Sequence, residues 1–171
     1  MSKVPNWFER QFNFTLSIDQ YPTVCIRLRG TPPRLEEVIR GAPRQILTRK
    51  LDGKWSPQEH AGHLLDLEPL WMARVEDFLT DREILTAADL SNRTTTEADH
   101  NAKDVRGVLA EFRAARLRLF DRIQGLPLDS LGRERLHPRL KRPMRLIDHL
   151  VFIAEHDDHH LAKVWELVAD H

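Results

Sequence analysis

The sequence predicts an all-α fold: a four-helix bundle with long crossover connections and a short N-terminal helix or arm. Four stretches repeat apolar residues at the three- and four-residue spacing of an amphipathic helix. Two long polar segments separate these stretches, and no stretch shows the alternation typical of a β-strand. The length of 171 residues suits one domain, so we expect residues 1–171 to form a single helical domain.

The first principal helix is expected to begin near Thr31. Two prolines follow directly and suit the first turn, where a missing N–H group costs nothing. Pro43 falls inside the apolar pattern and predicts a kink or a break. Residues 6–29 should add a short helix or arm that Pro22 interrupts. The apolar positions of the first helix are Leu35, Val38, Ile39, Ala42 and Ile46.

The second helix has the clearest start in the sequence. Ser56 and Glu59 form a capping box, with Pro57 at the first helical position. The helix is expected to run to about Thr80. Its apolar stripe is Leu64, Leu67, Trp71 and Phe78.

The third and fourth helices each follow a long polar connection. Residues 81–99 predict a crossover loop before the third helix, which should span residues 103–124. Residues 132–143 predict a second loop, and the fourth helix should then run from about Met144 to Val168. Three arginines of the third helix are expected to lie on its solvated outer face: Arg113, Arg116 and Arg118.

Composition narrows the function classes. Lys plus Arg and Asp plus Glu are 26 each, so the chain lacks the basic excess typical of a general nucleic-acid binder. A basic run at residues 133–145 is interpreted as a solvated loop, with an anion site as the alternative. The single cysteine, Cys25, excludes an internal disulfide and suits a reducing cytoplasm. We therefore expect a cytoplasmic protein without nucleic-acid or membrane partners; residues 1–10 lack the apolar run of a signal peptide.

The spacing of the histidines indicates a metal site. His156 and His160 are four residues apart, so on a helix both imidazoles lie on one face and can reach one ion. His159 points about 100° away. His63 is the best third ligand because it borders the apolar stripe of the second helix. It also lies in the opening turns of that helix, where the helix dipole disfavours the protonated imidazolium and so favours the neutral form that binds metal. His60 is the alternative, and chance surface histidines at this spacing are the competing interpretation.

Three protein ligands leave a coordination position open, which is typical of a catalytic metal site. No general base is evident, and the candidates for that catalytic role are His60 and Glu59, although the capping box already explains Glu59. Asp157 and Asp158 either orient the ligands or simply occupy the helix surface. We assign the tryptophans to the core or its rim rather than to a substrate platform: Trp55, Trp71 and Trp165.

Three stretches together resemble the DinB-like superfamily: residues 28–36, residues 54–64 with Glu68 and Arg74, and residues 137–161. The resemblance implies a four-helix bundle with a three-histidine site for nickel, zinc or a similar divalent ion. The family's first histidine follows its W-S-x-x-E motif by four residues and matches His63. The other two match His156 and His160. Relatives are often dimers.

The resemblance also implies an activity. Characterised relatives include transferases and isomerases that use a low-molecular-weight thiol such as bacillithiol or mycothiol. We therefore expect a metal-dependent transferase that acts on a small-molecule substrate, in which the ion activates the thiol. A non-catalytic metal-binding or dimerising helical module is one alternative, and a metal-dependent hydrolase is another. A homodimer is the expected assembly.

Overall fold

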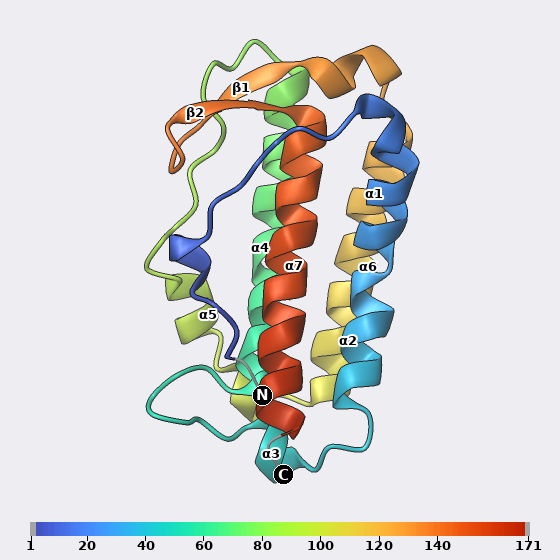
Figure 1. Ribbon diagram of the computed structural model, residues 1–171. Coiled ribbons are helices and arrows are strands. Elements are labelled where there is room, and N and C mark those ends of the chain that lie inside the picture. The colour runs from blue at the N-terminus through green and yellow to red at the C-terminus, as the bar shows by residue number, and fades with distance from the viewer. Residues whose placement is uncertain (1–2, 170–171) are drawn as a thin grey trace.

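The computed structural model describes residues 3–169, and four parallel or antiparallel rods dominate that part of the chain (Figure 1). Three rods are continuous helices: α4 (Pro57–Leu79), α6 (Val105–Gln124) and α7 (Leu146–Ala169). The fourth rod consists of α1 (Tyr21–Arg29) and α2 (Thr31–Ile39), which lie end to end beside α6 and α7 (Figure 1). The predicted all-α bundle is therefore confirmed.

The first rod begins ten residues earlier than the sequence predicted. Pro22 lies in the first turn of α1 and starts that helix, whereas we had expected it to interrupt one. The rod is broken at Gly30, directly before Thr31 and two prolines that cannot donate backbone hydrogen bonds. The predicted second break is present: α2 ends at Ile39, the chain turns at Gly41 with a positive φ of 77°, and Pro43 then caps the short helix α3 (Arg44–Leu47).

The predicted capping box starts α4. The Ser56 hydroxyl accepts from the Glu59 backbone N–H at 3.1 Å, and the Glu59 carboxylate accepts from the Ser56 N–H at 2.8 Å. These two bonds satisfy donors that a helix start otherwise leaves exposed. The cap matters for the site because the helix that it starts carries His60 and His63.

Short elements join the rods. The N-terminal arm holds η1 (Trp7–Glu9) and η2 (Ile18–Gln20), and η4 (Leu128–Gly132) follows α6. The first crossover contains α5 (Arg93–Glu97) and η3 (His100–Ala102).

The second connection is a β-hairpin, which corrects our expectation of a loop without strands. β1 (Glu134–His137) and β2 (Arg142–Arg145) pair antiparallel, with Glu134 opposite Arg145. Four-residue strands are too short for the alternation to stand out in the sequence. Arg135 donates to backbone carbonyls at the end of α4, and Arg145 pairs with Asp148 at 2.7 Å. These two arginines of the basic run therefore fasten the hairpin to α4 and α7 instead of facing solvent.

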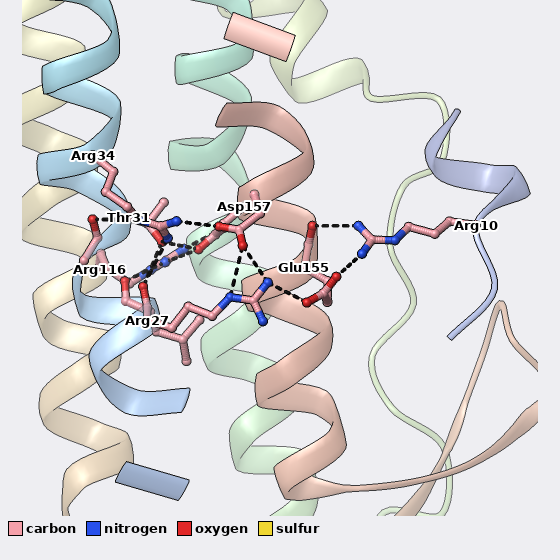
Figure 2. Close-up of polar contacts among 10 residues, drawn as sticks. Arg10, Arg27, Thr31, Arg34, Arg116, Glu155 and Asp157 are labelled. Carbon is pink, nitrogen blue, oxygen red and sulfur yellow. Dashed lines mark hydrogen bonds and ion pairs between the residues drawn. The ribbon is translucent and has the colours of Figure 1, made fainter. Parts of the chain in front are cut away.

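A buried charge cluster connects all four rods. The Arg116 side chain is inaccessible to solvent and donates to Glu68 of α4 at 2.6 Å, to Asp157 of α7 and to the Leu28 carbonyl of α1. Thr31 of α2 also donates to Asp157, at 2.7 Å (Figure 2). The expectation that Arg116 belongs to a solvated face was therefore wrong, because its partners come from three other helices.

The apolar core lies on both sides of this charge cluster along the bundle axis. The larger part lies toward the hairpin and includes Trp71, Phe78, Leu119, Ile123 and Ile153. The smaller part lies toward α3 and includes Leu35, Leu64, Phe112 and Leu161. No helix within residues 3–169 combines the length and the hydropathy that crossing a membrane requires.

Candidate metal centre

Three histidines from two helices meet inside the bundle. His63 comes from the second turn of α4, and His156 and His160 come from successive turns of α7. One ring nitrogen from each lies within 4.8 Å of the other two. All three side chains are buried, with 5 to 6% of their surface exposed. The structure thus brings together the three residues that the sequence singled out.

The spacing of the nitrogens suits a single ion. The Nε2 atoms of His156 and His160 are 3.2 Å apart. Two nitrogens bound at 2.0–2.1 Å to a tetrahedral ion would be separated by about 3.3 Å. The donor set is three neutral imidazoles, which suits zinc, nickel, copper or iron better than calcium or magnesium.

Hydrogen bonds on the outer nitrogens orient two of these rings. His63 Nδ1 lies 3.0 Å from the Thr95 hydroxyl of α5, and His160 Nδ1 lies 2.8 Å from His60 Nδ1. Each contact occupies Nδ1, so Nε2 is the ring nitrogen available to an ion. Contacts of this kind fix the tautomer and the ring angle of metal-binding histidines. His156 Nδ1 is buried and has no partner within residues 3–169.

Thr95 was missed by the sequence analysis, and it belongs to a longer chain of contacts. Burial alone would raise the pKa of the Asp66 carboxyl, but hydrogen bonds from His100 and Thr95 lower this pKa below its usual value. The His100 Nε2 atom lies 2.8 Å from the Asp66 carboxylate. Asp66 lies one helical turn after His63. This spacing is the one feature of the sequence that could have suggested the Asp66–Thr95 contact behind His63.

Electrostatics keep the clustered histidines neutral. Burial lowers the pKa of His63 to about 4 and the pKa of His60 to about 3. Burial also lowers the pKa values of His156 and His160 well below the ordinary value. At neutral pH all four rings are therefore in the form that binds metal. Burial makes the largest contribution to the lowered pKa of His63, whereas the sequence analysis had attributed the neutral form to the helix dipole.

A cavity of about 1130 Å³ opens onto the three histidines. Trp7 of the N-terminal arm covers one side, with its ring centroid 4.9 Å from that of His156. Trp55 covers another, with its centroid 4.6 Å from that of His63. The loop at residues 87–92, the hairpin turn, residues 51–54 and side chains of α4 and α7 also line the cavity. A cavity of this size accommodates a drug-sized ligand.

The other sequence candidates have separate places. His60 lines the cavity and contacts His160, whereas Glu59 is taken up by the capping box and by Lys50 at 2.9 Å. His159 lines the cavity beside the cluster, and burial lowers its pKa to about 4. Trp71 is buried in the core, and Trp165 is 53% exposed. Trp55 and Trp71 both line the cavity.

The acidic residues of α7 hold the first rod instead of orienting ligands. Asp158 accepts from Arg27 of α1 at 2.5 Å and from Arg34 of α2 at 2.7 Å. Glu155 accepts from Arg27 at 2.5 Å and from Arg10 of the N-terminal arm (Figure 2). The alternative in which Asp157 and Asp158 orient the histidines is therefore not supported by the contacts. These ion pairs instead fix α7 and the arm, which together form much of the cavity.

A family model for the DinB superfamily matches residues 27–164. The chain belongs to the DinB superfamily. A solved structure of YfiT from Bacillus subtilis, described as a probable metal-dependent hydrolase with an unusual four-helix bundle topology, has the same fold as this DinB-superfamily chain. The TM-score is 0.82 and the identity is 21%, over 94% of this chain and 93% of that one. No curated protein matches the chain.

Proposed function

We propose that this protein is a metal-dependent enzyme in which His63, His156 and His160 hold one divalent ion beside the cavity. The observation that carries the proposal is the convergence of three buried, neutral imidazoles at the wall of a cavity large enough for a substrate. A purely structural site would favour four protein ligands and a closed surround. The donor set favours zinc or nickel among divalent ions.

The reaction that we propose is transfer of a low-molecular-weight thiol to a small-molecule acceptor bound in the cavity. A bound divalent ion supplies Lewis-acid chemistry, which lowers the pKa of a thiol or of water. The protein residues would serve this chemistry in two ways. Thr95 and His60 keep the outer nitrogens of His63 and His160 occupied, and Trp7 and Trp55 exclude bulk water from the cluster.

Hydrolysis is the second candidate reaction. This reaction is favoured by the description of YfiT as a probable metal-dependent hydrolase and by the similarity between the YfiT fold and the fold of this protein. A non-catalytic module is less well supported, because a structural role does not account for a large cavity at the histidines. A homodimer remains part of the proposal, and light scattering of the purified protein measures it.

Metal content is the first test. We expect the purified, untagged protein to contain close to one equivalent of zinc, nickel or a similar ion by elemental mass spectrometry. The double variant His156→Ala/His160→Ala should lose it. His159→Ala is the matched control, since His159 lines the same cavity on the same helix and lies outside the cluster. Loss of metal in the control, or none in the wild type after incubation with divalent ions, would overturn the proposal.

Activity then separates the two reactions. The metal-loaded protein is incubated with cysteine and 1-chloro-2,4-dinitrobenzene for thiol transfer, and with 4-nitrophenyl acetate for hydrolysis. The proposal expects a rate in the first assay that requires both the thiol and the ion. Activity confined to the ester would replace thiol transfer by hydrolysis.

A further inference from the structure

Two arginines face the cavity without a carboxylate partner. Arg74 of α4 is 2% exposed, and its Nε donates to the Thr86 carbonyl at 2.8 Å. Arg139 lies in the hairpin turn, and its buried Nη2 has no hydrogen-bond partner within residues 3–169. Neither forms an ion pair in that described part of the chain. Burying the Arg74 cation without a counter-charge is costly, and the half-buried Arg139 adds a second positive charge beside it, so the pair requires an explanation.

The nearby carboxylates are engaged elsewhere. Asp77 accepts from Arg82 at 3.0 Å and from the Thr86 backbone N–H at 2.6 Å. Asp89 lines the cavity, but its carboxylate accepts from the backbone N–H groups of Ser91 and Arg93 at 2.9 and 3.1 Å. Burial lowers the pKa of Arg74 to about 10; the charge of Asp77 opposes this shift and the charge of Arg139 adds to it.

His137 adds a third donor at the same place. Its Nδ1 accepts from the backbone N–H groups of Arg139 and Leu140 at 3.2 and 3.1 Å. A neutral imidazole that accepts at Nδ1 carries its proton on Nε2. That Nε2 lies 3.2 Å from Arg74 Nη1, and a guanidinium cannot accept. The N–H groups of Arg74 Nη1 and His137 Nε2 therefore face one another. They need a shared acceptor, and no residue within 3–169 provides one.

We propose that Arg74, Arg139 and His137 bind the anionic head group of a small organic acid in this cavity. The anion supplies the shared acceptor for Arg74 and His137 and the counter-charge for both arginines. Hydrogen bonds from a guanidinium to an oxyanion are charge-assisted and are among the stronger polar contacts in proteins. The basic segment of the hairpin thus contributes one arginine to an anion site, while Arg135 and Arg145 fasten the hairpin.

The surroundings define the body of the acid as apolar and short. The Trp71 indole lies 5.6 Å from the His156 ring centroid and 5.6 Å from Arg74 Cζ. The Arg74 guanidinium carbon and the His156 ring centroid are therefore separated by no more than about twice that distance. Phe152 and Phe8 lie beside Arg139, with centroids 5.8 and 5.4 Å from its Cζ. An acid with an aromatic or aliphatic segment between its head group and its reactive atoms would fit this arrangement.

A reactive role for the acid rests on the proposed function, because the same cavity would be the active site. Binding of the head group requires no ion, so the test uses metal-free, full-length protein and calorimetric titration. The probes are 3-phenylpropionate and its neutral analogue 3-phenylpropionamide. We expect the wild type to bind the acid at least tenfold more tightly than the amide. Equal binding of the two probes would overturn the proposal, and inorganic phosphate binding as tightly as the acid would overturn the assignment to an organic acid.

Variants locate the binding. Arg74→Met and Arg139→Gln should each weaken binding of the acid at least tenfold, while binding of the amide changes little. Arg133→Gln is the matched control for net charge, because Arg133 is an exposed arginine just before the same hairpin. Arg139→Gln carries the test if Arg74→Met fails to fold. An undiminished preference for the acid in Arg139→Gln would overturn the proposal.

A final variant separates this inference from the metal proposal. His156→Ala/His160→Ala should retain its preference for the acid, since within residues 3–169 neither histidine forms a hydrogen bond with Arg74 or Arg139. Loss of the preference in that variant would overturn an anion site that is independent of the cluster.

Discussion

Trp7 packs edge-on against His156, with ring centroids 4.9 Å apart and an interplanar angle of 85°. The contact joins the N-terminal arm to α7 across more than half of the sequence. The same indole also packs against Phe12 and Phe152, with centroids 5.0 and 5.2 Å away. The arm is therefore an integral wall of the cavity and contributes to stability.

Removing this indole should destabilise the protein. Trp7→Ala deletes a partly buried aromatic side chain and its ring contacts, so the free energy of unfolding should fall by about 2 kcal/mol. Urea unfolding followed by circular dichroism measures the change. Trp165→Ala is the control, because Trp165 is 53% exposed and should change stability by less than about 0.5 kcal/mol. Equal effects of the two substitutions would mean that the arm does not stabilise the bundle.

The charge cluster at Arg116 predicts a larger loss. Arg116→Met leaves the buried Glu68 and Asp157 carboxylates without their shared partner, which should cost about 3–5 kcal/mol in urea unfolding. Arg118→Met, at an exposed position of the same helix, should be nearly neutral. Replacing all three charges with Arg116→Met, Glu68→Met and Asp157→Leu should recover much of the loss, because no unpaired charge then remains buried. A triple variant as unstable as the single one would contradict this account.

Arg116 also shows where sequence reasoning stops. Its position on α6 was predicted correctly. However, the sequence of a helix with several arginines does not indicate which of them is buried. The answer depends on Glu68, Asp157 and the Leu28 carbonyl, which belong to other helices. By contrast, the buried residues Phe112 and Ile123 of the same helix follow the apolar spacing of the sequence, which is a local signal.

Local signals also explain the other outcomes. The capping box at Ser56 fixed the start of α4 because all of its atoms lie within four residues. The hairpin was missed because its strands are short and its pairing to Ile84 and to the end of α4 is non-local. His63, His156 and His160 could be singled out from spacing and family resemblance. The sequence analysis included Arg74 only within the family resemblance and Arg139 only within the basic run. The contacts of these two residues and of Thr95 could not be predicted, because they depend on the path of the connecting loops.

Gly62 predicts a close-packing constraint beside the cluster. A Cβ atom built at Gly62 would lie 2.2 Å from Cγ and Cδ2 of the His100 ring, which Asp66 and the bond from Gln58 to the His100 carbonyl hold in place. Gly62→Ala should therefore lower the free energy of unfolding by about 1–3 kcal/mol. Gly107→Ala is the matched control: nothing lies near its Cβ, so alanine should stabilise α6 by about 0.5–1 kcal/mol. Stabilisation by both substitutions in urea unfolding would contradict the constraint.

Buried histidines predict acid sensitivity. His149 is inaccessible to solvent, neither ring nitrogen has a partner within residues 3–169, and burial lowers its pKa well below the ordinary value of 6.5. Below pH 6.5 the unfolded chain binds a proton at this position that the folded chain excludes, so stability falls as the pH falls. Each such group contributes up to about 1.4 kcal/mol per pH unit.

His149→Leu tests this linkage directly. The substitution removes two unpartnered polar atoms and should raise stability at pH 7 by about 1 kcal/mol. The difference from the wild type should then widen by up to about 1.4 kcal/mol per pH unit as the pH falls from 6.5 toward 5. Urea unfolding of the metal-free proteins at several pH values measures both effects. Parallel stability curves would show that His149 does not resist protonation.

The order in which the chain is made has a consequence for the histidine cluster. His63 precedes His156 by more than half of the sequence, and synthesis adds only about 5–20 residues per second. During translation α4 therefore leaves the ribosome seconds before α7 exists, and the nascent chain presents at most one of the three imidazoles. An ion held by this set is acquired after translation of α7, so the cellular supply of metal at that moment helps to decide which ion is loaded.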